Sequence, residues 1–67
     1  MIALLRNKRE AIGMTQIQLA ERLDVSQTVI SKIETCERRL DVVELIDVCN
    51  AINISVIDFF NELNTKL

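Results

Sequence analysis

The stretch formed by residues 15–34, TQIQLAERLDVSQTVISKIE, constrains the fold of this chain more than any other segment. It opens on a T-x-x-Q capping box, which is typical of a helix N-terminus. Asp24 can adopt the left-handed backbone of a tight turn, and Ser26 is a favourable N-cap for a following helix. We therefore expect two short helices joined by a tight turn, with the second helix covering residues 27–35.

The rest of the chain predicts three more helices and so an all-α fold. Residues 2–12 carry apolar side chains at helical spacing and end at Gly13, which suits the left-handed residue after a helix. Asp41 and Ser55 are the expected N-caps of the fourth and fifth helices. The chain has no proline and one glycine, so the turn-bounded strands of a β-protein are missing from the pattern. Its length supports a single domain over residues 1–67 with one core.

Helical periodicity divides the apolar residues into a core set and a surplus. The positions expected to face the core are Ile2, Leu5, Arg9, Ile12, Leu19, Ala20, Leu23, Ile30, Ile33, Val42, Leu45, Ile46, Cys49, Ile52, Val56, Phe59 and Leu63. The surplus lies within residues 40–67, in the last two helices and the tail, and comprises Val43, Val48, Ile57, Phe60 and Leu67. Either these residues are the scattered apolar exposure that is normal for a small domain, or they form the dimer surface of a homodimer.

Charge is distributed unevenly along the chain. Residues 1–39 carry seven basic and five acidic groups, a net of +2, whereas residues 40–67 carry one basic and five acidic groups, a net of −4. The two parts sum to the overall −2. This distribution suits a molecule with one face toward phosphate groups and one face away from them.

Several classes of function are disfavoured by composition. There is no histidine, and the two cysteines, Cys36 and Cys49, have no CxxC partner, so we expect reduced cysteines and no metal site. No nucleophile has an evident base, and no glycine-rich loop could cradle phosphates, so we expect neither an enzyme nor a cofactor. The chain has no run of about 18 apolar residues and no signal peptide, which favours a cytoplasmic protein without a membrane partner.

Residues 5–63 resemble the phage-repressor and Cro-type helix-turn-helix family, also called the XRE family. The residues that carry the resemblance are Gln16, Leu19, Ala20, Leu23, Val25, Ser26, Ile30, Ser31, Ile33, Glu34, Leu45, Ala51 and Ser55. The resemblance implies a five-helix lambda-repressor-like DNA-binding domain whose second and third helices form the helix-turn-helix. The chain departs from the family at Asp24 and Cys36, where glycine is common.

The resemblance also implies a set of functional residues, each of which would otherwise be read as a polar, solvated surface position. The implied base-contacting residues are Gln27, Thr28, Ser31 and Lys32, and the implied phosphate-contacting residues are Gln16, Ser26, Arg38 and Arg39. Glutamine can pair with adenine, lysine with guanine, and the threonine methyl group with a thymine methyl group. Arg9 matches a family position whose arginine pairs with the glutamate matched by Glu34, which implies a structural ion pair.

Two functions remain open at this stage. The leading one is a sequence-specific regulator of transcription that binds a palindromic stretch of double-stranded DNA as a homodimer, with repression as the simplest mechanism. The alternative is an antitoxin-like module whose C-terminal helices, within residues 40–67, hold a partner protein. No small-molecule ligand is evident in either case.

Overall fold

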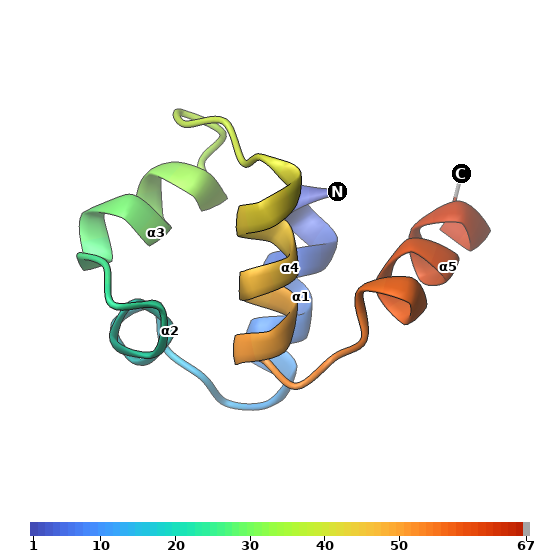
Figure 1. Ribbon diagram of the computed structural model, residues 1–67, viewed down its shortest axis with the longest axis horizontal. Helices are drawn as coiled ribbons and strands as arrows, with labels where there is room; N and C mark the ends of the chain where they lie inside the picture. The colour runs from blue at the N-terminus through green and yellow to red at the C-terminus, as the bar shows by residue number, and fades with distance from the viewer. Residues whose placement is uncertain (67) are drawn as a thin grey trace.

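The computed structural model describes residues 1–66, and within this range it contains five α-helices and no strand (Figure 1). The helices are α1 (Ile2–Ala11), α2 (Gln16–Leu23), α3 (Gln27–Glu34), α4 (Val42–Ala51) and α5 (Val56–Lys66). The all-α class that the sequence predicts is therefore confirmed. Figure 1 shows α3 and α5 on opposite sides of the pair formed by α1 and α4.

Two reciprocal capping boxes begin α2 and α4. The hydroxyl of Thr15 accepts a hydrogen bond from the backbone N–H of Gln18 at 3.1 Å, and the Gln18 side chain accepts the Thr15 N–H at 2.9 Å. Asp41 and Glu44 repeat the arrangement at α4, with distances of 2.8 and 3.2 Å. Each box satisfies two N–H groups that a helix start leaves without a partner. Ser26 holds the N-cap position of α3, but its side chain accepts no capping bond, so that part of the prediction is wrong.

Left-handed residues follow each of the first four helices, beginning with the predicted Gly13 (φ 72°) after α1. Asp24 (φ 57°) follows α2, Cys36 (φ 63°) lies just beyond α3, and Asn53 (φ 61°) lies just beyond α4. The Asp24 N–H donates to the carbonyl groups of Ala20 and Glu21, so α2 closes despite the missing glycine. The turn between α2 and α3 therefore forms as the sequence predicts, with the strain that a side chain carries in this conformation.

The core gathers side chains from all five helices. It contains Leu4, Leu5, Met14, Leu19, Ala20, Ile30, Leu45, Val48, Cys49, Ile52 and Phe59. Phe59 is the largest fully buried side chain, and it fastens α5 to the rest of the molecule. Helix α2 contacts both α3 and α4, α4 contacts α5, and α1 contacts α3. The helix-turn-helix is thus packed on a continuous core, which fixes the direction in which α3 faces solvent.

The buried face of α4 differs from the expected one. Val48 is 4 % exposed and belongs to the core, so its assignment to a dimer surface is wrong. Val42 and Ile46, expected in the core, are 67 % and 38 % exposed. The physical reason is that residues 42–52 hold two overlapping apolar stripes at helical spacing, and α4 buries the stripe that contains Val48. The corresponding error at α1 is Ile12, the residue just after the helix, which is exposed, while Leu4 within the helix is buried.

The other apolar residues that the sequence analysis left outside the core lie in α4, α5 and the tail. Val43, Ile57 and Phe60 are exposed, as expected, and Leu67 lies outside the described residues. With Val42 and Ile46 added and Val48 removed, the exposed large apolar residues of α4 and α5 are Val42, Val43, Ile46, Ile57 and Phe60. No helix of the described residues is long and apolar enough to cross a membrane.

Candidate nucleic-acid interface

Helix α3 presents a polar face to solvent because its apolar face is buried. Ile30 and Ile33 are buried, and they leave Gln27, Thr28 and Lys32 exposed on the other side of the helix. Ser31 is half-buried. These are the four residues that the sequence assigned to base contacts. The structure brings them onto one short helix of 8 residues, a length that fits within a major groove.

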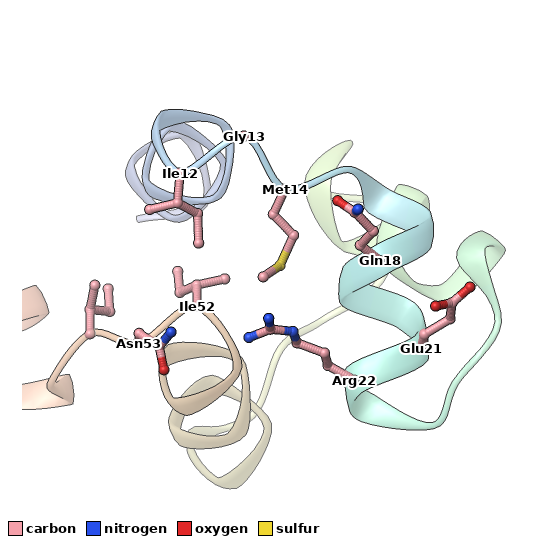
Figure 2. A pocket seen from close by; sticks show the side chains of 9 residues that line it. Ile12, Gly13, Met14, Gln18, Glu21, Arg22, Ile52 and Asn53 are labelled. Carbon is pink, nitrogen blue, oxygen red and sulfur yellow. The ribbon is translucent and has the colours of Figure 1, made fainter.

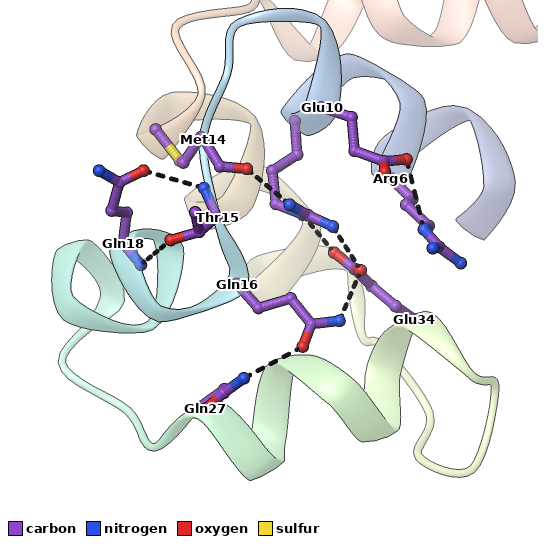
Figure 3. A network of polar contacts seen from close by, with 9 residues as sticks. Arg6, Glu10, Met14, Thr15, Gln16, Gln18, Gln27 and Glu34 are labelled. Atoms are coloured by element: carbon purple, nitrogen blue, oxygen red, sulfur yellow. Dashed lines mark hydrogen bonds and ion pairs between the residues drawn. The ribbon is translucent and has the colours of Figure 1, made fainter.

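A polar network joins α1, α2 and α3 (Figure 3). The Arg9 guanidinium donates to both carboxylate oxygens of Glu34, from Nε at 2.7 Å and from Nη2 at 2.9 Å. Gln16 donates to Glu34 from Nε2 at 3.0 Å. At the edge of the network Gln27 Nε2 lies 3.5 Å from Gln16 Oε1. The Gln27 side chain at the start of α3 is therefore connected, through Gln16, to the ion pair at the other end of that helix.

The Arg9–Glu34 pair is structural and well buried. Each of the two side chains is only 7 % exposed. Burial raises the pKa of Glu34, but the hydrogen bonds from Arg9 and Gln16 outweigh it and hold that pKa below its ordinary value. Glu34 also stands at the C-terminal end of α3, where the helix dipole disfavours a negative charge, so the Arg9 charge compensates for its position. The pair pins α1 to the end of α3, as the resemblance implied.

Two of the expected phosphate contacts lie at helix starts. Gln16 is the first residue of α2 and is half-buried, with its amide engaged by the network. Ser26 precedes α3 and is exposed, and its hydroxyl is not used as a cap. The unpaired N–H groups of a helix start favour an anion, so both positions are chemically suited to a phosphate group.

The two arginines of the α3–α4 loop differ in their surroundings. Arg38 Nη2 lies 2.6 Å from Glu44 Oε2, and its Nη1 donates to the Arg39 carbonyl group at 3.2 Å. The hydrogen bond between the two side chains raises the pKa of Arg38 and lowers the pKa of Glu44. Within residues 1–66, Arg39 has no ion-pair partner, and neither has Lys32. The sequence did not reveal this difference, because the two arginines are adjacent and chemically identical.

A shallow hollow lies between the end of α1, helix α2 and the α4–α5 turn (Figure 2). Its volume is about 690 Å³, and its floor includes Ile52 and Met14. Arg22 extends across it and donates from Nη1 to the Ala51 carbonyl group at 2.8 Å. This bond satisfies a carbonyl group at the C-terminal end of α4, and no residue of α3 lines the hollow. It is therefore separate from the polar face of α3.

The turn between α2 and α3, the exposed polar face of α3 and the ion pair behind it make up a helix-turn-helix, the motif of DNA-binding regulators of transcription. The helix-turn-helix family model matches residues 5–59 of the chain. The chain belongs to this family, and within it to the XRE type.

Solved structures agree with that assignment. An XRE-family like protein from Pseudomonas syringae pv. tomato str. DC3000 is 40 % identical with a TM-score of 0.92, over 97 % of this chain and 79 % of that one. A mutant of the restriction-modification controller protein C.Esp1396I is 29 % identical with a TM-score of 0.89, over 97 % of this chain and 84 % of that one. A search of curated proteins finds no significant match.

Proposed function

We propose that this protein represses transcription by binding a palindromic operator as a homodimer, with α3 inserted into the major groove. The observation that carries the proposal is the division of α3 into a buried apolar face and an exposed polar face. The exposed side chains are amide, hydroxyl and ammonium groups, which match the donors and acceptors at base edges. A repressor bound in this way acts by occupying the site that RNA polymerase needs.

Each exposed polar residue of α3 makes a different contact with the DNA. Gln27 pairs with adenine through its amide, Lys32 donates to guanine, and the Thr28 methyl group contacts a thymine methyl group. Ser31 is half-buried and contributes a hydroxyl group at the edge of this surface. Each well-formed pair discriminates against a wrong base by about 1–3 kcal/mol. Gln16, Ser26 and the arginine-bearing loop between α3 and α4 hold the phosphate backbone and so fix the register of α3.

The exposed apolar residues of α4 and α5 support the homodimer. They are Val42, Val43, Ile46, Ile57 and Phe60. They lie on two helices that contact each other, and a contiguous apolar patch there would mark a protein–protein surface. Two copies joined through these residues by a two-fold axis would present two copies of α3 to the two halves of a palindrome.

Selection of bound duplexes from a random pool, followed by fluorescence anisotropy with the selected sequence, tests the proposal. We expect a palindromic consensus, and we expect Gln27→Ala and Lys32→Ala each to weaken binding to that sequence by about 1–3 kcal/mol. Asn7→Ala, an exposed position on α1, is the matched control and should bind as the parent does. A parent protein that binds no duplex at low salt would refute the DNA-binding function itself.

A protein-binding module is the second candidate, because the same apolar residues could cover a foreign surface. Sedimentation of the purified chain separates the two readings. A stable homodimer that dissociates on Phe60→Glu substitution supports the regulator. A monomer that dimerises at no accessible concentration, and gains stability only with a partner protein, supports the module.

A further inference from the structure

The loop between α3 and α4 places two adjacent arginines beside the proposed DNA surface. The backbone N–H groups of Glu37 and Arg38 both donate to the Lys32 carbonyl group, at 2.9 and 3.2 Å. These bonds fold the loop back onto the C-terminal end of α3. Arg38 and Arg39 therefore begin directly beyond the helix that we expect to enter the major groove.

Arg38 is already occupied by a carboxylate of its own chain. Its Nη2 lies 2.6 Å from Glu44 Oε2, and its Nη1 donates to the carbonyl group of Arg39. The other oxygen of Glu44, Oε1, accepts the Asp41 N–H in the capping box at 3.2 Å. A single carboxylate thus holds the arginine with one oxygen and the start of α4 with the other. Arg39 has no such partner within residues 1–66.

We propose that Glu44 keeps Arg38 away from the DNA backbone, so that Arg38 positions the loop while Arg39 makes the loop's phosphate contact. The inference rests on the proposed DNA-binding function. For Arg38 to reach a phosphate group, it must give up Glu44 and leave that carboxylate beside a polyanion. For Arg39 the same contact displaces only water and counterions.

This division affects specificity as well as affinity. Contacts to phosphate bind every sequence equally and account for most non-specific binding. By neutralising one of the two loop cations, Glu44 limits this sequence-independent term. The base contacts of α3 then contribute a larger share of the binding free energy. Glu44 is on this view a specificity-determining residue that touches neither base nor phosphate.

The dependence of affinity on salt tests the proposal, because a purely structural role does not change it. Affinity falls as salt rises, and each phosphate contact adds about 0.9 to the steepness of that fall, which is the salt slope −d log K/d log salt. Three variants are needed: Glu44→Gln, Arg38→Gln and Arg39→Gln. Glutamine at position 44 retains an oxygen for the Asp41 N–H, so the capping box survives while the charge is lost.

A matched control separates the release of Arg38 from a simple change in net charge. Glu62→Gln removes one negative charge and breaks an ion pair of similar exposure, Lys8–Glu62. That pair joins α1 to α5, and Figure 1 shows α5 on the side of the molecule away from α3. Circular dichroism and light scattering confirm that each variant is folded and retains the assembly state of the parent before its binding is measured.

The proposal predicts four distinct results. Arg39→Gln lowers the slope by about 0.9 per protomer, and Glu44→Gln raises it by about 0.9. Between 50 and 200 mM salt, that change corresponds to a difference of about 3.5-fold in affinity per protomer. Arg38→Gln weakens binding by the same factor at every salt concentration and leaves the slope unchanged, because it disturbs the loop without removing a phosphate contact. Glu62→Gln leaves the slope unchanged.

Three results would overturn it. A slope for Arg38→Gln that falls as far as that of Arg39→Gln shows that Arg38 leaves Glu44 for the DNA. An unchanged slope for Glu44→Gln shows that the released Arg38 reaches no phosphate group. A slope for Glu62→Gln that rises as much as that of Glu44→Gln shows that the effect comes from net charge alone. A parent protein that binds no DNA at all is a different outcome, because it refutes the proposed function and this inference with it.

Discussion

Replacement of Glu34 by alanine is the sharpest test of the Arg9–Glu34 ion pair, which joins α1 to the end of α3. The substitution removes both acceptors of the Arg9 guanidinium and the acceptor of the Gln16 amide. Arg9 then keeps the Met14 carbonyl group as its remaining protein acceptor, and its side chain is 7 % exposed. A buried charge without its partner is far less stable than the same charge in water.

The magnitude follows from the burial of the pair. Removing one partner of a buried pair costs about 3–5 kcal/mol, and the lower end applies because no part of so small a domain is far from water. A 67-residue domain has a total stability of roughly 3–10 kcal/mol. For a domain of this size each kcal/mol corresponds to roughly 4–8 °C in Tm. Glu34→Ala should therefore lower Tm by roughly 12–24 °C, or leave the chain unfolded at room temperature.

Thermal and urea unfolding followed by circular dichroism measure this loss. Glu37→Ala, an exposed acid three residues further along, is the control and should melt within about 3 °C of the parent. The double variant Arg9→Met/Glu34→Leu should recover much of the loss, because an apolar pair of similar volume leaves no charge without a partner. If Glu34→Ala melts as the control does, the pair does not stabilise the fold and the reasoning is wrong.

Three further predictions follow from the same contacts. The folded-state pKa of Glu34 lies below its unfolded value, so its contribution to stability is complete above the unfolded pKa of about 4.3 and is lost as pH falls through the folded pKa. The urea midpoint of the parent protein should therefore fall in that acid range. The midpoint of Glu34→Gln, which has no carboxyl group at this position, should fall by less over the same range. Asp24→Gly should leave Tm unchanged or raise it, by up to about 1 kcal/mol in unfolding free energy, because glycine removes the left-handed strain; a clear loss would contradict this account of the turn. Val48→Asp should abolish the cooperative melt, whereas Val43→Asp should leave the monomer folded and weaken dimerisation in sedimentation; equal effects of the two would contradict the observed face of α4.

The helix boundaries could be predicted from the sequence because the forces that set them are local. A capping box needs only a side chain and a backbone N–H group three residues away, so Thr15 and Asp41 could be recognised from their neighbours alone. The left-handed residues Gly13 and Asp24 could be found for the same reason. Ser26 is the exception, since its residue type suits a cap that the observed side-chain orientation does not form.

The buried face of α4 could not be predicted because it depends on contacts with other helices. Its sequence carries two overlapping apolar stripes, and both have the spacing of one helix face. Contacts with α2 and α5 select the stripe with Val48 and leave Val42 in water. The consequence reaches function, since the exposed stripe adds two apolar residues of α4, Val42 and Ile46, to the proposed dimer surface.

The ion pairs show a second limit of the sequence. The Arg9–Glu34 pair spans 25 positions, and only the resemblance to a family indicated it. Arg38 and Glu44 are six residues apart, but a loop lies between them, so their separation in the chain does not fix their distance in space. A carboxylate has two oxygens, and here each binds a different group, so the cap and the ion pair coexist. The sequence can therefore indicate that cations stand beside a DNA surface, but which of two adjacent arginines is available to a phosphate group depends on what the neighbouring helix places against it.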